Sequence, residues 1–353
     1  MEMHIVIAVF FFITVALAFC EDYLKESHKT YILAGYAIFM ILLATTKSVG
    51  DTADALVYED LFYRNDDTFI QLVTEPTYIY ISRIVLALGG SIGVIFFIYA
   101  IISIPAKLKL YASMTPYVFT ALMIYIPVYF ELHDMIQIRV AAAGMFLLAS
   151  LNPIANKKYW LATGLMICAI LFHYSAVVYL PFLWIGNRTM NRTMRIVVGG
   201  LLPICLTLYI LKLDWFSFIP SSISAIDYKI ETYQKEAEEG DWEELFPLFL
   251  NLYYIAKCAM LYLCLYFYDF LVEKHRMAPL LISLFAVSVL FLPSMATIPV
   301  IASRISDLFG LVDCIIFTFS LYLVKPNYIA RIAIAIVGLF MVVYNMMFTD
   351  YFT

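Results

Sequence analysis

Three arginines and one histidine stand at the ends of, or inside, long apolar stretches of this sequence. Arg83 and Arg304 each begin such a stretch, Arg139 lies about one turn inside another, and His173 falls in the middle of residues 159–186. Ionisable groups in membrane-spanning segments are costly and therefore indicate a functional site. A guanidinium binds phosphate oxygens through paired hydrogen bonds and keeps its charge when partly desolvated, so we predict that the three arginines bind a diphosphate.

Each of these side chains also has a structural interpretation. Arginines at helix ends commonly extend to the membrane surface, which is the alternative for Arg83. A histidine at a forced turn can hydrogen-bond a main-chain carbonyl, which is the alternative for His173. For the two deeper arginines the alternative is an ion pair, and the candidate acidic partners are Glu131, Asp134 and Asp307.

Acidic residues form a second group of candidates, within residues 46–83. Asp51 and Asp54 are three residues apart, and Glu75 directly precedes Pro76. Paired carboxylates can take a proton from a hydroxyl group, bind sugar hydroxyls or hold an ion, although a solvated acidic loop has the same pattern. A carboxylate before proline often caps a helix, which is the alternative for Glu75.

Two further charges, Lys257 and Asp313, lie near the middle of apolar stretches. Either they form a buried salt bridge that fixes helix register, or they relay protons. We favour the salt bridge.

The composition indicates which class of protein must position these groups. Of 353 residues, 64% are hydrophobic and 14% are charged, with a mean hydropathy of +0.89. A soluble domain has about 45–50% apolar and about 25% charged residues, so a soluble enzyme, a secreted disulfide scaffold and a disordered chain are excluded. The net charge of −5 without a basic block argues against a nucleic-acid partner. The six cysteines lack metal-ligand spacing and are predicted to be buried.

Apolar stretches long enough to span a membrane recur along the whole chain. They predict an all-α, polytopic integral membrane protein that forms one transmembrane domain over residues 1–353, with about 10–12 spans. Basic clusters placed in the cytoplasm put two acidic segments outside, 46–83 and 213–246, and the second of these is predicted to contain a short amphipathic helix. The predicted spans are 5–20, 31–46, 84–104, 114–130, 136–151, 159–186, 195–212, 247–270, 278–296, 305–323 and 329–347.

One of these stretches conflicts with a single crossing. Residues 159–186 follow Lys157 and Lys158 and precede Arg188, so both ends belong in the cytoplasm. The segment must therefore enter and return, as a re-entrant or broken-helix hairpin that turns near His173. Non-helical backbone at membrane depth is tolerated only inside protein or beside a watery cavity, so we expect His173 to face a cavity.

Several of these residues occur in short motifs whose order resembles the EpsG-type family of bacterial polysaccharide polymerases, which is functionally grouped with Wzy proteins. The resemblance extends from about residue 45 to 310. The motifs are Gly50-Asp51-Thr52 with Asp54 and Tyr58, Glu75-Pro76, Gln137-Ile138-Arg139-Val140-Ala141-Ala142, Ala169-Ile170-Leu171-Phe172-His173-Tyr174-Ser175-Ala176 and Ser303-Arg304.

The resemblance implies an enzyme that polymerises O-antigen, capsule or exopolysaccharide in the bacterial cytoplasmic (inner) membrane, with its active face outside. Its substrate would be a polyprenyl-diphosphate-linked oligosaccharide, membrane lipid would surround it, and a chain-length regulator protein is a candidate partner. No cofactor or metal is expected, because cations can offset the charge of a diphosphate leaving group. The predicted roles are catalysis for His173, Asp51 and Asp54, diphosphate binding for Arg139, Arg304 and Arg83, and substrate binding for Glu75, Gln137 and Tyr58.

Other functions remain open at this point. An O-antigen ligase would need much the same cavity. A flippase or secondary transporter also has broken helices and intramembrane charges, but it should show repeat symmetry and sites near the midplane. This sequence has no detectable internal repeat, and its charges gather at the outer ends of the spans, so an enzyme is favoured.

Overall fold

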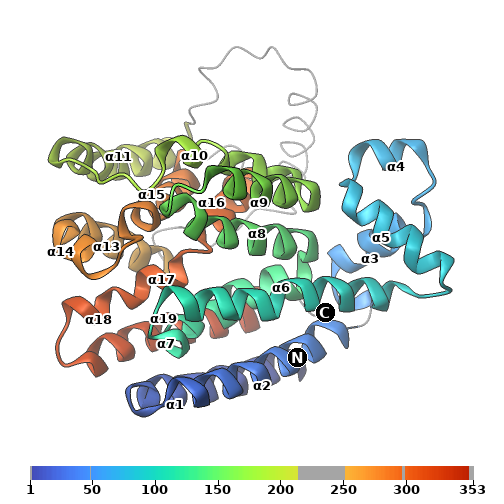
Figure 1. The fold of residues 1–353 in the computed structure, drawn as a ribbon, viewed down its shortest axis with the longest axis horizontal. Helices are drawn as coiled ribbons and strands as arrows, with labels where there is room; N and C mark the ends of the chain where they lie inside the picture. Colours follow the sequence, from blue (N-terminus) through green and yellow to red (C-terminus); the bar gives the residue numbers. More distant parts are fainter. Residues whose placement is uncertain (1, 48, 214–250, 296–298, 350–353) are drawn as a thin grey trace. The chain divides into compact units, whose positions relative to one another are not determined.

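The computed structural model describes residues 2–47, 49–213, 251–295 and 299–349, and every regular element within these ranges is helical (Figure 1). Helices dominate because each backbone N–H and C=O group inside a bilayer must find its hydrogen-bond partner within the chain. The predicted all-α, polytopic class is therefore confirmed. The predicted outer segment 213–246 lies outside the described residues except for its first one.

Among the described residues, six helices are long and apolar enough to cross a membrane, and the number rises to eight when each of two bent helix pairs is taken as one span. The six are α1 (Glu2–Cys20), α2 (Glu26–Thr45), α6 (Ile92–Met114), α8 (Ile138–Ala155), α11 (Arg192–Ile210) and α19 (Asn327–Phe348). The first bent pair is α13 (Leu252–Tyr266) with α14 (Tyr268–Lys274), at 84°, and the second joins α16 (Pro299–Gly310) to the helical segment Asp313–Leu323, at 50°.

The remaining predicted spans coincide with shorter elements, which explains why the predicted number is higher. A seven-residue helix, α7 (Val118–Ile124), continues into a π-helix, η3 (Tyr125–Ile136), and α15 (Ala278–Ser294) has 17 residues. The span expected over 84–104 is divided, because α5 (Pro76–Ala87) ends in a turn before α6 begins. Gly89 adopts a φ of +75° in this turn, a conformation that favours glycine.

The chain forms two compact units. The first consists of Met1–Gly186 and Ser320–Thr353, and the second of Asn187–Phe319. The second unit contains α11, α13 to α16 and α17 (Asp313–Thr318). Besides the helices already given, the first unit contains α3 (Ala53–Tyr63), α4 (Thr68–Val73), α9 (Tyr159–Phe172), the 3-10 helix η4 (Tyr174–Tyr179), α10 (Phe182–Ile185) and α18 (Ser320–Leu323).

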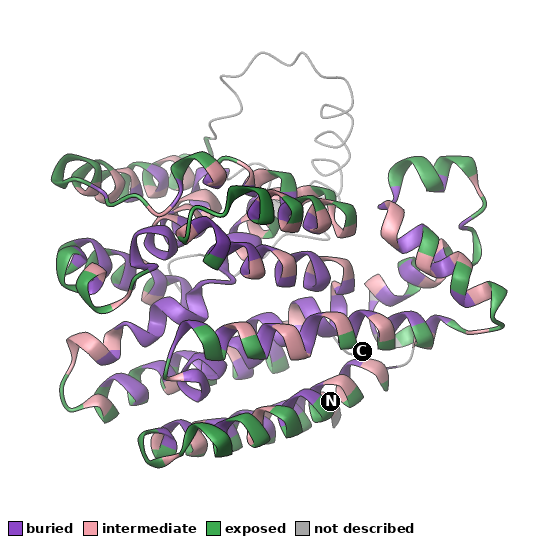
Figure 2. Cartoon of the chain, in the orientation of Figure 1, coloured by how far each residue is buried: buried purple, intermediate pink, exposed green. Residues whose placement is uncertain are grey.

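Large apolar side chains are exposed along several of the long helices. Figure 2 shows exposed residues recurring along α1, α2 and α11, whereas α8 is mostly buried. Phe12 of α1 is 55% exposed and Ile196 of α11 is 65% exposed. Apolar surface of this extent is rare on soluble monomers, and it fits helices whose outer faces contact lipid.

Two carboxylates of η3, Asp134 and Glu131, are buried in polar networks of the first unit. Asp134 pairs with Lys107 at 2.8 Å, and neither side chain has any exposed surface. Neither carboxylate pairs with Arg139, so these two alternatives for the arginine are wrong. Asp134 also accepts hydrogen bonds from Ser103 and Tyr125. Glu131 contacts His4 and accepts a hydrogen bond from Asn345.

The predicted salt bridge between Lys257 and Asp313 is confirmed in the second unit. Lys257 Nζ lies 2.9 Å from Asp313 Oδ2, and the two side chains are 4% and 0% exposed. Tyr253 Oη also donates to Asp313 (2.6 Å), and Lys257 Nζ donates to Ser288 Oγ (2.6 Å). These bonds hold α13, α15 and α17 in register.

Replacing Lys257 with methionine is expected to destabilise the protein by about 3–5 kcal/mol, because it leaves the Asp313 carboxylate buried without its counter-charge. Thermal unfolding in detergent checks this. The double variant Lys257→Met/Asp313→Asn should recover most of the loss, and equal destabilisation of the single and double variants would contradict the assignment.

The segment 159–186 is broken at the predicted position. Helix α9 ends at Phe172, and His173 has an extended backbone (φ −157°, ψ 118°) before η4 begins. A Cβ atom placed on Gly186 would lie 3.8 Å from the Tyr159 hydroxyl oxygen, so the two ends of the segment lie side by side. The predicted broken-helix hairpin is therefore confirmed.

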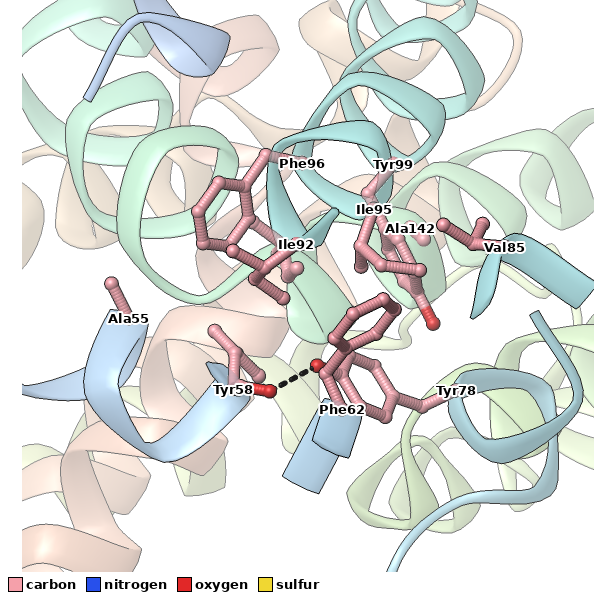
Figure 3. Close-up of a cluster of buried hydrophobic side chains, with 11 residues drawn as sticks. Ala55, Tyr58, Phe62, Tyr78, Val85, Ile92, Ile95, Phe96, Tyr99 and Ala142 are labelled. Carbon is pink, nitrogen blue, oxygen red and sulfur yellow. Dashed lines mark hydrogen bonds between the residues drawn. The ribbon is translucent and has the colours of Figure 1, made fainter. Parts of the chain in front are cut away.

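The helices α3 and α5 pack against α6 and α8 through a hydrophobic cluster (Figure 3). Tyr58 and Phe62 come from α3, Tyr78 from α5, Tyr99 from α6 and Ala142 from α8, and all are buried. The Tyr78 hydroxyl donates a hydrogen bond to the main-chain oxygen of Tyr58 (2.5 Å). This cluster fixes α3 and α5 on a buried base, whereas residues 46–83 were predicted to form an outer loop.

Candidate active site

Glu75 lies at the centre of a charged cluster in the first unit. It is the residue before α5, and Pro76, whose fixed φ suits the first helical position, begins the helix. Its side chain is 5% exposed and makes no capping hydrogen bond to α5, so the capping alternative for Glu75 is wrong. The carboxylate instead forms an ion pair with Arg139 Nη1 and lies 2.9 Å from His173 Nδ1.

Arg139 lies beside two aromatic rings, which also contact each other. It is the second residue of α8, and its guanidinium carbon lies 5.2 Å from the ring centre of Tyr58 and 5.8 Å from that of Tyr78. Cation–π contacts of this length stabilise a partly desolvated guanidinium. The side chain is 20% exposed, and its Nε atom is buried without a hydrogen-bond partner. Because only Nη1 is engaged by Glu75, donors remain for a second anion.

His173 reaches Glu75 because the helix is broken there. Its extended backbone turns the side chain away from the axis of α9, and the next residue, Tyr174, donates its main-chain N–H to Glu75 (3.4 Å). Thr77 in the first turn of α5 donates to the carbonyl of Leu171 (2.7 Å), one of the carbonyls that a helix end leaves without a partner. The start of α5 is thus hydrogen-bonded to the chain on both sides of His173, at Leu171 and at Tyr174.

The electrostatics of the cluster keep Glu75 ionised. Burial raises the pKa of Glu75, but the hydrogen bond from His173 and the positive charge of Arg139 outweigh burial and lower this pKa to about 2. An ionised carboxylate on Nδ1 fixes the imidazole tautomer, with the proton on Nδ1 and the lone pair on Nε2. A carboxylate–histidine pair in this arrangement can serve as a general base.

This lowered pKa predicts a pH dependence of stability. The Glu75 contribution should be fully present above about pH 4.5, its ordinary pKa, and should be lost as the pH falls towards 2. We expect the difference in free energy of unfolding between the wild type and Glu75→Gln to shrink between pH 5 and pH 3. Thermal unfolding across this range checks it, and a constant difference would contradict an ionised, paired Glu75.

Two other predicted residues, Tyr58 and Asp54, lie beside the cluster on α3. They are four residues apart on one face of the helix. Burial raises the pKa of Tyr58 to about 12; the positive charge of Arg139 lowers it by a smaller amount, and the negative charge of Asp54 raises it further. Tyr58 is therefore a neutral phenol at physiological pH. The side chain of Asp51 lies outside the described residues, so its predicted role stays a prediction.

The remaining predicted residues lie further along α5, at the start of α8 two residues before Arg139, and in the second unit. Arg83 is about two turns further along α5, where Nη2 bonds the carbonyl of Asn65 (3.2 Å) and lies 3.5 Å from Asp66. Gln137 is the junction between η3 and α8, and its N–H donates to the carbonyl of Leu132 (2.8 Å). Arg304 is exposed on α16 of the second unit, and its diphosphate role stays a prediction.

Two residues that contribute to the cluster, Tyr78 and Thr77, were not predicted from the sequence. Both are in the first turn of α5, directly after Glu75-Pro76. The proline provides a signal for them, because it marks the start of a helix and so places residues two and three positions after Glu75 on its first turn. Within the described part of the chain, no three His, Cys, Asp or Glu side chains gather as a metal-ion site requires.

A comparison with protein families agrees with the order of motifs in the sequence. The family described as the EpsG family matches residues 29–353. The match includes Glu75, Arg139, His173 and Arg304. Neither the curated proteins nor the solved structures contain a match to this chain.

Proposed function

The chain belongs to the EpsG family, and from this membership we propose that it is a membrane-embedded polysaccharide polymerase. It joins polyprenyl-diphosphate-linked oligosaccharide repeat units at the outer face of the bacterial cytoplasmic membrane. The observation that carries the proposal is the Glu75–His173 pair beside Arg139. It combines a base with a fixed cation, which glycosyl transfer from a diphosphate requires.

In the proposed reaction, His173 Nε2 takes the proton from the acceptor hydroxyl while the hydroxyl oxygen forms a bond to the anomeric carbon of the donor. The bond between that carbon and the diphosphate oxygen breaks, and polyprenyl diphosphate leaves. Glu75 holds the Nδ1 proton and stabilises the imidazolium that forms. Arg139 offsets the charge that develops on the leaving diphosphate, as a preorganised donor in a site with little water.

The other predicted residues have supporting roles in this proposal. Asp54, on the same face of α3 as Tyr58, binds hydroxyl groups of the sugar, and Asp51 does the same or replaces His173 as the base. Arg304 and Arg83 supply further positive charge for the diphosphate. The geometry favours His173 as the base, because the carboxylate on Nδ1 already orients its ring.

Deletion of the gene in its host, followed by electrophoresis of surface polysaccharide, tests the reaction class. We expect the ladder of chain lengths to vanish while single repeat units stay attached to their surface acceptor. Loss of all repeat units would contradict a polymerase and indicate flipping or ligation. An unchanged ladder would contradict any role in chain growth.

A further inference from the structure

The second unit carries a groove that the proposed reaction does not use. It is an open groove of about 590 Å³ between α11 and the bent pair α13 and α14. Its walls combine charge with apolar and aromatic surface, since they include Arg192, Arg195, Ile196, Tyr262, Leu265 and Asp269. All of these residues belong to one compact unit.

The groove lies where the spanning parts of two helices meet the membrane surface. The span of α11 begins at Arg192, and α13 ends at Tyr266, after which the chain bends by 84° into α14. Tyr266 is 81% exposed, and tyrosines are enriched at the level of lipid headgroups. The two arginines of α11 are therefore at headgroup depth, with the apolar wall below them along the helix.

Arg195 is held in a fixed position in this groove. Its guanidinium carbon lies 5.0 Å from the ring centre of Tyr268, whose hydroxyl accepts a hydrogen bond from the N–H of Met190 (2.8 Å). Nη1 pairs with Asp269 at 2.9 Å, but Asp269 is 79% exposed, so this pair contributes little and can be exchanged. Nε is buried without a hydrogen-bond partner, so the residues around the guanidinium do not saturate its donors.

Arg192 provides a second charge one turn away. It is exposed and forms no ion pair with any residue that the structure describes. The helices approach closely at Gly199, where the Tyr262 hydroxyl donates to the glycine carbonyl (3.0 Å). Below the arginines the groove is therefore shallow and lined by Ile196 and Leu265.

We propose that this groove binds an anionic phospholipid, with the phosphate at Arg192 and Arg195 and one acyl chain along Ile196 and Leu265. A free phosphate would leave the apolar wall unused, and a zwitterionic headgroup would bring its own cation beside the arginines. The basic residues that surround the groove place it in the cytoplasmic leaflet. The site is therefore independent of the proposed active site, which is expected at the opposite membrane face.

Native mass spectrometry of the full-length protein in detergent tests this site, with phosphatidylglycerol and phosphatidylcholine as probes. Each arginine near a lipid surface contributes about 1 kcal/mol, so we expect phosphatidylglycerol affinity to fall about 30-fold in Arg192→Gln/Arg195→Gln. Arg195→Lys should keep most of the charge and lose less. Arg188→Gln is the matched control, because Arg188 is an exposed arginine near the start of α11 that does not line the groove.

Four outcomes would overturn the proposal. They are equal binding of both lipids, an equal loss in the Arg188→Gln control, displacement of phosphatidylglycerol by millimolar inorganic phosphate, and stronger binding of polyprenyl phosphate than of phosphatidylglycerol. Thermal unfolding of each variant without added lipid separates a loss of folding from a loss of the site. Because chain growth is not the readout, a failure here is distinguishable from a failure of the proposed polymerase function.

Discussion

His173→Ala is expected to lower the rate of glycosyl transfer by about 10²–10⁴-fold, the usual contribution of a positioned general base. The substitution removes Nε2, the atom that takes the acceptor proton, and it leaves Glu75 paired with Arg139. His173→Gln should be equally inactive, because an amide can hydrogen-bond Glu75 but cannot accept the proton. Initial rates with the purified protein, and with repeat-unit lipid extracted from the deletion strain, measure the effect.

The matched control is His28→Ala, since His28 is an exposed histidine on α2. It should retain wild-type rates. If His173→Ala accumulates in the membrane and still transfers at more than a tenth of the wild-type rate, His173 is not the base. Asp51 and Asp54 would then be the next residues to replace.

Arg139→Lys is the second substitution with a large expected effect, a loss of about 10²–10³-fold in the transfer rate. This is the range observed when one preorganised donor to a developing anion is removed. Lysine keeps the positive charge and can still pair with Glu75, so folding should be largely preserved. It lacks the planar fork of donors, and it cannot make the same contacts with the rings of Tyr58 and Tyr78.

The comparison between lysine and alanine at position 139 separates catalysis from folding. Arg139→Ala leaves the Glu75 carboxylate buried beside His173 alone and should also reduce the amount of protein in the membrane. Arg64→Lys is the control, because Arg64 is an exposed arginine at the end of α3 that pairs with the neighbouring Asp60 and Asp67. A normal ladder from both Arg139 variants would contradict its proposed role at the diphosphate.

Local sequence patterns predicted the elements of this protein well, because lipid imposes a local constraint. Long apolar stretches must form helices, since their backbone groups have no other partner in a bilayer. The conflict between Lys158 and Arg188 required the chain to return within 159–186, and the structure has the break at His173. The buried pair of Lys257 and Asp313 was predictable for the same reason, because an isolated charge at that depth is too costly.

The division of 76–114 into α5 and α6 was not predictable in this way. Residues 84–104 contain no charged residue, and hydropathy does not reveal where such a segment turns, although Gly89-Gly90-Ser91 is a local turn signal. The separation follows from Gly89 and from the packing of α3 and α5 on α6, which buries Tyr58 and Tyr78. A turn of this kind depends on the partner surface as much as on its own residues.

The sequence by itself determined that this chain is a helical membrane protein of the EpsG family, and it singled out Glu75, Arg139 and His173 as groups that an apolar environment must accommodate. Only the tertiary structure decided which of them meet. Glu75 is 64 residues from Arg139 and 98 from His173, and acidic residues closer in sequence, Glu131 and Asp134, proved to have other partners. A buried charge requires a counter-charge, but the packing of α5, α8 and the broken end of α9 selects which one it meets.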